Sequence, residues 1–275
     1  MRDDARMASP SPAGSDVTIV TGCSRGIGRA IATHLAAAGH RLVLVARDHD
    51  RLAALAAELT PTLAARGAPA PLVCAADLAD PAAPDRVVAA ATAAFGAPTV
   101  VVNNAGTAPA DKVENTTDAM LAATYALHVA APLAFARATV GAMKQQRRGC
   151  LLQLASTAGL RGYPFTAAYT AAKHGMVGLS RALHAELGAA GIAVYALCPG
   201  FVDSDITRAA AAAIAARGRT SAAEAFARMA AQNRIGHMHQ PDEVAAAVAM
   251  LLRDRPSGCV YDLDRDEPGF VDSPS

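Results

Sequence analysis

The sequence predicts an α/β protein: a doubly wound, parallel sheet of seven strands with helices on both faces and a small helical lid. Two observations predict it. Short runs of valine, isoleucine and leucine alternate with longer segments rich in alanine and leucine. The short runs are apolar at consecutive positions, which is typical of strands that helices cover on both faces. No linker or repeat divides the pattern, so we expect one domain over residues 16–275 after a disordered tail, residues 1–15.

The individual elements follow in order along the chain. The expected strands are Val17–Thr21, Arg41–Ala46, Leu72–Ala75, Thr99–Val102, Leu151–Ala155, Ile192–Leu197 and Cys259–Leu263. The expected helices lie near residues 27–38, 49–66, 82–95, 117–146, 166–189 and 241–253. Right-handed crossovers between parallel strands would arrange them as a doubly wound sheet.

Residues 203–236 lie outside this alternation, between the sixth strand and the last helix. They are rich in alanine, and Ser221 and Glu224 have the spacing of a capping box, which predicts a second short helix there. A segment inserted after the carboxyl end of a strand lies over the ligand crevice of such a sheet. We therefore expect it to form a lid over the substrate.

Composition excludes several classes of function. Of the 275 residues, 52% are hydrophobic and 18% charged, which is enough apolar material for a large core and too little charge for disorder. The formal net charge of +1 argues against nucleic acid or an anionic membrane as a partner. The longest nearly uncharged apolar stretch, Val87–Val102, contains Gly96 and Pro98 and so is not expected to span a membrane.

The five cysteines are scattered and contain no Cys-x-x-Cys pair. This pattern argues against a disulfide scaffold and against a zinc site, so we expect no metal and a cytoplasmic, reducing location.

A glycine-rich segment, Thr21–Gly28, follows the first strand and opens the first helix. Glycines at this place allow a tight turn and let backbone N–H groups approach a pyrophosphate at the helix N-terminus. The segment therefore favours a dinucleotide site.

Four further motifs follow in a fixed order, each next to an expected strand or helix: Asp77-Leu78, Asn103-Asn104-Ala105-Gly106, Tyr169 to Lys173 with Ser156 thirteen residues before the tyrosine, and Pro199-Gly200. With the glycine segment, they resemble the classical short-chain dehydrogenase/reductase family over Val17–Val260. The resemblance is to members that act as 3-oxoacyl-thioester reductases or 3-hydroxyacyl-CoA dehydrogenases, and it implies a Rossmann-type sheet.

The resemblance also implies which residues bind the cofactor: Gly22, Ser24, Arg25, Gly26, Ile27, Gly28, Arg47, Asp77, Leu78, Asn104, Ala105, Gly106, Pro199, Gly200 and Val202. Enzymes that use NAD place an acid at the end of the second strand, where this chain has Ala46 followed by Arg47. A guanidinium there matches a 2′-phosphate, and Arg25 supplies a second one. We therefore expect NADP(H) rather than NAD(H).

Tyr169 and Lys173 lie one helical turn apart and share a face of their helix. A free tyrosine has a pKa near ~10, and a nearby ammonium favours the phenolate. We expect Tyr169 to act as general acid in reduction and general base in oxidation, and Ser156 to stabilise charge on the substrate oxygen.

The family usually adds an asparagine, and His128 stands in its place. The resemblance implies that the backbone carbonyl of this residue holds a water linked to Lys173, a role that a histidine keeps. The alternative is that the imidazole is an added titrating group of the site.

The substrate is less well defined. The lid carries Arg208, Arg217, Arg219, Arg228 and Arg234, and a cationic lid suits the phosphates of an acyl thioester carrier, although such charges often only solubilise a surface helix. The expected apolar lining is Leu160, Tyr163, Phe165 and Phe201. These side chains suit a cyclic, steroid-like or polyketide ketone equally well.

Two further expectations concern assembly and class. Arg265 and Asp266 replace the glycines of the Asp-Gly-Gly turn that usually ends the last strand, so a homodimer through residues 117–146 and 166–189 is expected more firmly than a homotetramer. A non-catalytic dinucleotide-binding regulatory protein is the alternative from a different class. Such proteins typically lose the tyrosine or the lysine, and this chain keeps both.

Overall fold

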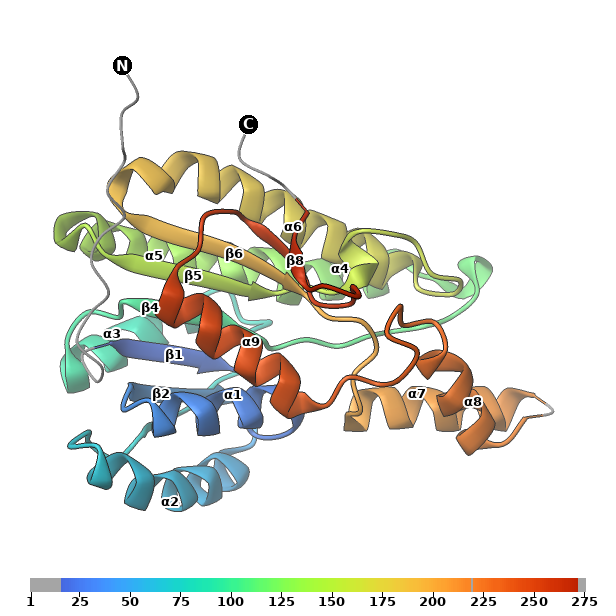
Figure 1. Ribbon diagram of the computed structural model, residues 1–275, viewed down its shortest axis with the longest axis horizontal. Coiled ribbons are helices and arrows are strands. Elements are labelled where there is room, and N and C mark those ends of the chain that lie inside the picture. The colour runs from blue at the N-terminus through green and yellow to red at the C-terminus, as the bar shows by residue number, and fades with distance from the viewer. Residues whose placement is uncertain (1–15, 219, 272–275) are drawn as a thin grey trace.

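The computed structural model describes residues 16–218 and 220–271, and these form one sheet covered by helices (Figure 1). The strand order is β3-β2-β1-β4-β5-β6-β7-β8. The strands are β1 (Val17–Thr21), β2 (Arg41–Ala46), β3 (Leu72–Ala75), β4 (Val100–Asn103), β5 (Gly149–Leu154), β6 (Ile192–Cys198), β7 (Val260–Asp262) and β8 (Gly269–Phe270). The doubly wound parallel sheet is thus confirmed, and its order reverses between β1 and β4, where such sheets bind ligands.

The sheet has eight strands in the described part of the chain, not the predicted seven. The additional strand, β8, has only two residues and pairs antiparallel with β7. A strand this short leaves no periodic signal in the sequence, because its partner and not its own pattern holds it in place.

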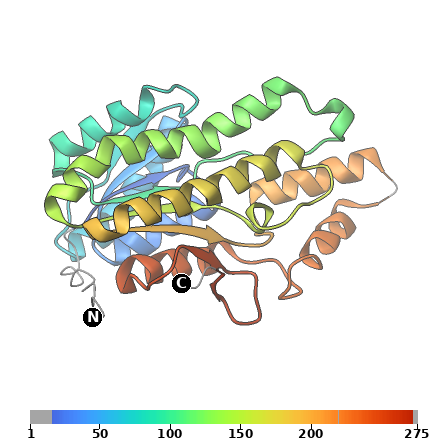
Figure 2. The ribbon, with the colours of Figure 1, turned by 90° about the horizontal axis from the view of Figure 1, so that it is seen from above.

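The helices are α1 (Gly26–Ala37), α2 (His49–Ala65), α3 (Ala83–Phe95), α4 (Asp118–Tyr125), α5 (Ala131–Gln146), α6 (Ala167–Leu187), α7 (Asp205–Arg217), α8 (Ala222–Ala230) and α9 (Pro241–Asp254). One apolar core packs α1, α2 and α9 against one face of the sheet. A second core packs α3 and α5 against the other face, where α4 and α6 also lie (Figures 1 and 2). Every residue of β1, β4 and β5 is buried, as the unbroken apolar runs predicted.

The lid predicted over residues 203–236 consists of α7 and α8, which extend beyond the body of the sheet (Figure 1). The predicted capping box is present: the Ser221 hydroxyl accepts from the Glu224 N–H, and the Glu224 carboxylate accepts from the Ser221 N–H. A separate small core of buried side chains holds the two helices together, formed by Ala211, Ala225, Met229 and Met238. The lid is therefore a packed unit with its own interior.

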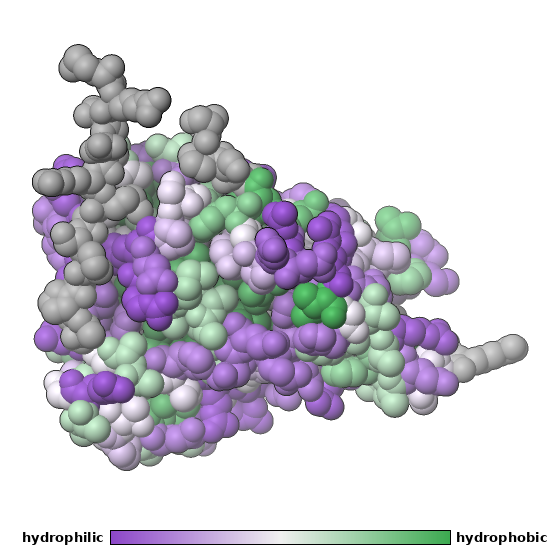
Figure 3. Space-filling view, in the orientation of Figure 1, coloured by the Kyte–Doolittle hydropathy of each residue, from purple (hydrophilic) through white to green (hydrophobic). Residues whose placement is uncertain are grey.

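The continuous helical segment Asp118–Gln146, which comprises α4, a π-helical turn and α5, is long and apolar enough to cross a membrane by length and composition alone. Within its most apolar window 44% of the residues are buried, and the segment packs against α3 and α6. A core helix of a soluble protein passes the same test. On the face shown in Figure 3, apolar residues occur as separate patches among hydrophilic ones. The predicted tail, residues 1–15, lies outside the described residues.

Candidate active site

The glycine segment turns from β1 into α1 with two residues in the left-handed region, Gly22 at φ +66° and Gly26 at φ +54°. A Cβ on Gly22 would meet the Ala105 Cα at 2.7 Å, so this glycine allows the turn after β4 to pack closely. At Gly26 the nearest atom to such a Cβ is the Ser204 Cβ, at 4.0 Å. The loop is thus closed toward β4 and open beside Gly26, where a ligand can approach the N-terminus of α1.

The turn after β4 is tied to the end of β1 by hydrogen bonds. The Asn104 side chain donates to the backbone oxygens of Thr21 and Gly22 at 2.8 and 3.0 Å. The Thr21 hydroxyl accepts from the N–H groups of Asn104 and Ala105 at 2.9 and 3.0 Å. The two strands at the switch point of the sheet therefore end in one connected structure. Thr21 anchors this structure and was not predicted as a site residue, although its place at the end of the first strand is visible in the sequence.

The residues expected at the adenosine side lie on loops that follow β1, β2 and β3. Arg47 directly follows β2, is exposed, and makes no side-chain hydrogen bond or ion pair with the described residues. Arg25 is also exposed, and its guanidinium lies 3.6 Å from the Asp205 carboxylate of α7. Asp77 caps its own loop by accepting from the Ala79 N–H, and Leu78 is buried. One arginine is thus unengaged, while the other contacts the lid.

The three residues of the expected catalytic group come together from β5 and α6. Ser156 follows the end of β5, and its hydroxyl hydrogen-bonds the Tyr169 phenol. The Lys173 ammonium lies 5.6 Å from the centre of the Tyr169 ring and donates to the Leu154 carbonyl at 2.6 Å. A hydroxyl, a phenol and an ammonium therefore meet at the carboxyl edge of the sheet, on the far side of the switch point from the glycine segment.

The pKa values at this group differ from the expectation that Lys173 lowers that of Tyr169. Burial raises the pKa of Tyr169 to about 12, and the hydrogen bond from Ser156 only partly opposes it. Burial also lowers the pKa of Lys173 to about 7. Desolvation disfavours both charged forms and is the largest cause of both shifts. The phenol therefore holds its proton at neutral pH, as a proton donor requires.

His128 lies in the π-helical turn between α4 and α5 and is 1% exposed. Its ring meets the Tyr169 ring edge-on, with 5.6 Å between centres, and its Nε2 lies 2.8 Å from the Thr107 carbonyl oxygen. A Cβ on Gly106 would collide with the imidazole at 2.5 Å. Burial first, and the charge of Lys173 second, lower the pKa of His128 to about 3. This direction favours the neutral imidazole and argues against the alternative that His128 titrates at physiological pH.

Of the expected substrate residues, the structure brings Tyr163 and Phe201 together. Their rings meet edge-on at 5.6 Å, with an interplanar angle of 78°. Leu160 instead packs against a buried cluster that contains Met176 and Val177. Phe165 is 62% exposed and has φ +66°, a conformation that is an outlier for a bulky residue. The aromatic pair is the part of the predicted lining that forms a defined wall.

The segment after β6 carries Pro199, Gly200 and Val202. The Pro199 carbonyl accepts from the Thr157 N–H at 2.9 Å, which joins this segment to the loop after Ser156. Val202 forms an isolated β-bridge with His239 at the end of the lid. Asn233, which was not predicted, holds this segment: its side chain accepts from the Phe201 N–H and donates to the Phe201 and His237 carbonyls. An asparagine that ends an alanine-rich helical stretch was the available signal.

The charges of the lid are more balanced than a cationic surface requires. Arg208 pairs with Asp203 at 2.6 Å and stacks over the Phe226 ring. The Arg217 side chain and Arg219 lie outside the described residues. Each acid at the start of the lid therefore pairs with an arginine, which weakens the argument for carrier recognition by net charge.

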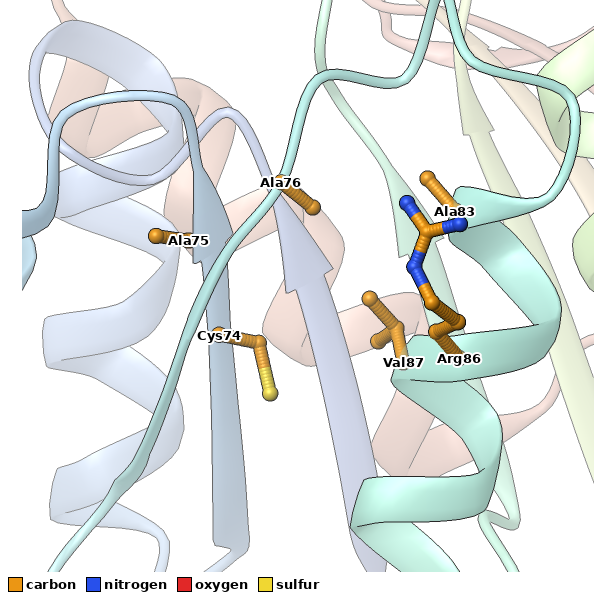
Figure 4. A pocket seen from close by; sticks show the side chains of 6 residues that line it. All are labelled: Cys74, Ala75, Ala76, Ala83, Arg86 and Val87. Carbon is orange, nitrogen blue, oxygen red and sulfur yellow. The ribbon is translucent and has the colours of Figure 1, made fainter.

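A cavity of about 180 Å³ lies between β3 and α3. Figure 4 shows Cys74, Ala76 and Val87 around it, with the Arg86 side chain extended along its rim. Arg86 pairs with Asp80 at 2.6 Å. This cavity contains none of the residues at the ends of β4, β5 and β6 and is separate from the catalytic group.

Comparison with known proteins agrees with this geometry. Residues 16–215 match the family described as short chain dehydrogenase. The chain is 36% identical over 252 residues to a granaticin polyketide synthase putative ketoacyl reductase of Streptomyces violaceoruber, covering 90% of each. It is 31% identical over 238 residues to the 3-oxoacyl-(acyl-carrier-protein) reductase FabG of Escherichia coli K12, covering 86% of this chain and 90% of that protein. A solved actinorhodin polyketide ketoreductase with NADPH superposes with a TM-score of 0.83 at 29% identity, covering 92% of this chain and 97% of that one.

Proposed function

The chain belongs to the short-chain dehydrogenase family, and from that membership we propose that it is an NADP(H)-dependent oxidoreductase that interconverts a ketone and a secondary alcohol. The leading substrate is a 3-oxoacyl or 3-hydroxyacyl thioester. One observation carries the proposal: Ser156, Tyr169 and Lys173 meet at the carboxyl edge of the sheet, beside the switch point that the glycine segment lines.

The residues present fit a dinucleotide phosphate. The open face of Gly26 at the start of α1 suits a pyrophosphate, because a helix N-terminus attracts anions. Arg47, with no partner of its own among the described residues, suits a 2′-phosphate, and Arg25 can join it. Both arginines are exposed, so a phosphate can reach both guanidinium groups. When bound, NADPH supplies the hydride.

In reduction, Tyr169 donates the proton that the substrate oxygen takes up. Its raised pKa keeps that proton in place until negative charge develops on the oxygen. The Ser156 hydroxyl, already within hydrogen-bonding distance of the phenol, stabilises the same charge. The Lys173 ammonium, held by the Leu154 carbonyl, stabilises the phenolate that remains. His128 holds the edge of the Tyr169 ring from the opposite helix and remains neutral throughout.

The thioester class is supported by the relatives, which are named as ketoacyl and 3-oxoacyl carrier-protein reductases. The aromatic pair Tyr163–Phe201 favours a second candidate, the ketone of a cyclic polyketide, because flat rings pack against such a wall. The two candidate substrates would use the same catalytic residues. They differ only in the part of the substrate that would lie against the lid.

The test compares acetoacetyl-CoA with acetoacetyl-N-acetylcysteamine and with a bicyclic ketone, 2-tetralone. If the carrier is recognised, kcat/KM for the CoA thioester should exceed that for the short analogue by roughly tenfold, about 1.4 kcal/mol. Equal values would contradict carrier recognition, and turnover of 2-tetralone alone would establish the second candidate. No turnover of any of the three would contradict the proposed function.

The same assay run with NADPH and with NADH tests the role of Arg47. NADPH should give the higher kcat/KM, and Arg47→Asp should lower its use by roughly tenfold or more while leaving NADH use unchanged or improved, because the carboxylate repels a 2′-phosphate and accepts from a ribose hydroxyl. Arg51→Asp, at an exposed position of α2 one turn further along, is the matched control. A wild-type preference for NADH would contradict this assignment.

We infer a homodimer rather than a homotetramer. Leu121 and Tyr125 of α4 and Leu133 of α5 are exposed apolar side chains on the helices expected to form the dimer contact. The outer edge of β7 is already paired with β8, whose Phe270 ring packs edge-on against Tyr261. A paired edge is not available to another chain. Light scattering should give the mass of two chains, and a mass of four would contradict the inference.

All five cysteines are free, which supports a reducing location such as the cytoplasm.

A further inference from the structure

The loop that carries Tyr163 and the exit of the lid both connect to one buried carboxylate. Asp264 follows β7, and its side chain is fully buried. Its Oδ1 accepts from the Arg234 N–H at 3.0 Å, on the segment between α8 and α9. Its Oδ2 lies 3.5 Å from the Arg161 guanidinium, on the loop between β5 and α6. A buried carboxylate requires such partners, so Asp264 fixes both segments to the end of the sheet.

Two further groups pack against the same carboxylate. The His239 Nε2 lies 3.5 Å from the Asp264 Oδ1, and its own backbone bonds Phe201 and Asp203. A Cβ on Gly200 would lie 2.9 Å from the Asp264 Cγ, so the segment after β6 touches the carboxylate with its backbone. In Figure 2 the chain after β7 runs beside the segment between α8 and α9, as these contacts require.

Arg161 connects this carboxylate to the aromatic wall. Its Nε donates to the Tyr163 hydroxyl at 2.9 Å, and its Nη2 donates to the Gln232 carbonyl at 3.2 Å, just after α8. The Tyr163 hydroxyl also shares a hydrogen bond with the Thr157 hydroxyl at 2.8 Å. Held from both sides, the Tyr163 ring stands edge-on to Phe201. One planar guanidinium thus joins the wall, the lid exit and the sheet, a set of contacts that suits arginine and not lysine.

We propose that Arg161, anchored by Asp264, is a positioning residue for substrate selection: it fixes the Tyr163 ring and the lid exit relative to each other and so sets the width of the opening that receives the group beyond the reacting carbonyl. Neither residue touches Ser156, Tyr169 or Lys173 in the contacts described above. The pair therefore acts on how well a bulky ketone fits and leaves the proton transfer unaffected. This inference rests on the proposed ketone reductase activity.

The first experiment measures kcat and KM of Arg161→Leu with 2-tetralone and with ethyl acetoacetate, a small acyclic ketone. The Arg161 side chain is 40% exposed, and Asp264 keeps the Arg234 N–H as a partner, so we expect the variant to fold, which its thermal unfolding checks. KM for 2-tetralone should rise roughly tenfold, the order of effect of a misfitted apolar group, while kcat and KM for ethyl acetoacetate should change less than twofold. Equal changes for both ketones would overturn the proposal.

A double-mutant cycle with Tyr163→Phe distinguishes positioning of the Tyr163 ring by Arg161 from a general loosening of the surrounding structure. Phenylalanine keeps the ring and removes only the hydroxyl that Arg161 holds. The KM effects of Arg161→Leu and Tyr163→Phe should therefore not multiply in the double variant, because each breaks the same connection. Fully multiplicative effects would overturn the proposal. Asp264→Asn, which keeps the shape and removes the charge, should shift the ratio of the two KM values in the same direction.

Hydrogen exchange gives a readout that needs no turnover. In Arg161→Leu, amide exchange should rise in both residues 157–166 and residues 231–240, since Arg161 joins the two segments. Arg253→Leu, which removes an exposed ion pair with Asp254 in the last turn of α9, is the matched control and should change neither. A rise in only one segment would overturn the coupling. If the wild-type protein reduces neither these two ketones nor the acetoacetyl thioesters, the proposed function fails, while this measurement still decides whether Arg161 couples the segments.

Discussion

Replacement of Tyr169 by phenylalanine should lower kcat for ketone reduction by roughly a thousandfold, within the range of about 10²–10⁴ that a positioned general acid contributes. The variant keeps the ring that contacts His128 and loses only the hydroxyl that Ser156 hydrogen-bonds. NADPH binding, measured by fluorescence titration, should change little, because the proposed cofactor contacts lie on the loops after β1 and β2. Steady-state rates with the most active ketone provide the measurement.

The control for this variant is Tyr125→Phe, which removes the hydroxyl of an exposed tyrosine on α4. It should be fully active. If Tyr169→Phe retained more than a tenth of the wild-type kcat, the phenol would not be the proton donor, and the role given to Ser156 would need revision as well. If NADPH binding were lost with activity, the effect would lie in cofactor binding and not in proton transfer.

Replacement of Lys173 by methionine should produce a more stable and nearly inactive protein. Lys173 is 5% exposed, and burial lowers the pKa of its ammonium from 10.5 to about 7. Below about pH 7 the folded protein therefore holds a costly buried charge, whereas between about pH 7 and 10.5 the folded form is neutral and only the unfolded chain is charged. The cost is fully present below pH 7 and fades as the pH rises toward 10.5. Activity should fall by about a hundredfold or more, since the phenolate loses its stabilising cation.

The expected gain in stability follows from the lowered pKa of Lys173. At about 1.36 kcal/mol per pKa unit the buried charge costs up to roughly 5 kcal/mol, and the Leu154 carbonyl left without its donor offsets part of the gain. We expect a net gain of about 1–3 kcal/mol in urea unfolding at pH 6, and a clearly smaller gain at pH 10. Lys144→Met, at an exposed lysine of α5 that pairs with Glu186, is the matched control and should gain nothing. An equal gain at both pH values would show that the charge of Lys173 is not its source.

The sequence alone predicted the parallel sheet, because strands that helices cover on both faces are largely apolar along their whole length, as β1 and β5 are apart from two threonines and one glutamine. It also predicted the second short helix, α8, since the capping box at Ser221 depends only on residues three apart. The proximity of Tyr169 and Lys173 was predictable in the same way, because residues one helical turn apart lie on one face. Such features depend on local spacing, which the sequence displays directly.

Tertiary structure decided the rest, because burial and long-range pairing are not local properties. The sequence shows Tyr169 and Lys173 but not how deeply the fold buries them. This burial reverses the expected direction of the Tyr169 pKa shift. The sequence placed His128 beside the site, but only the packing against Gly106 and Tyr169 makes the imidazole neutral. Arg161 and Asp264 are 103 residues apart in the chain, and no periodicity joins residues at that separation. The motifs and the fold class therefore follow from spacing along the chain. The charge states of Tyr169, Lys173 and His128 depend instead on which distant residues pack around them and exclude water. The position of the Tyr163 ring likewise depends on contacts between residues that are far apart in the chain.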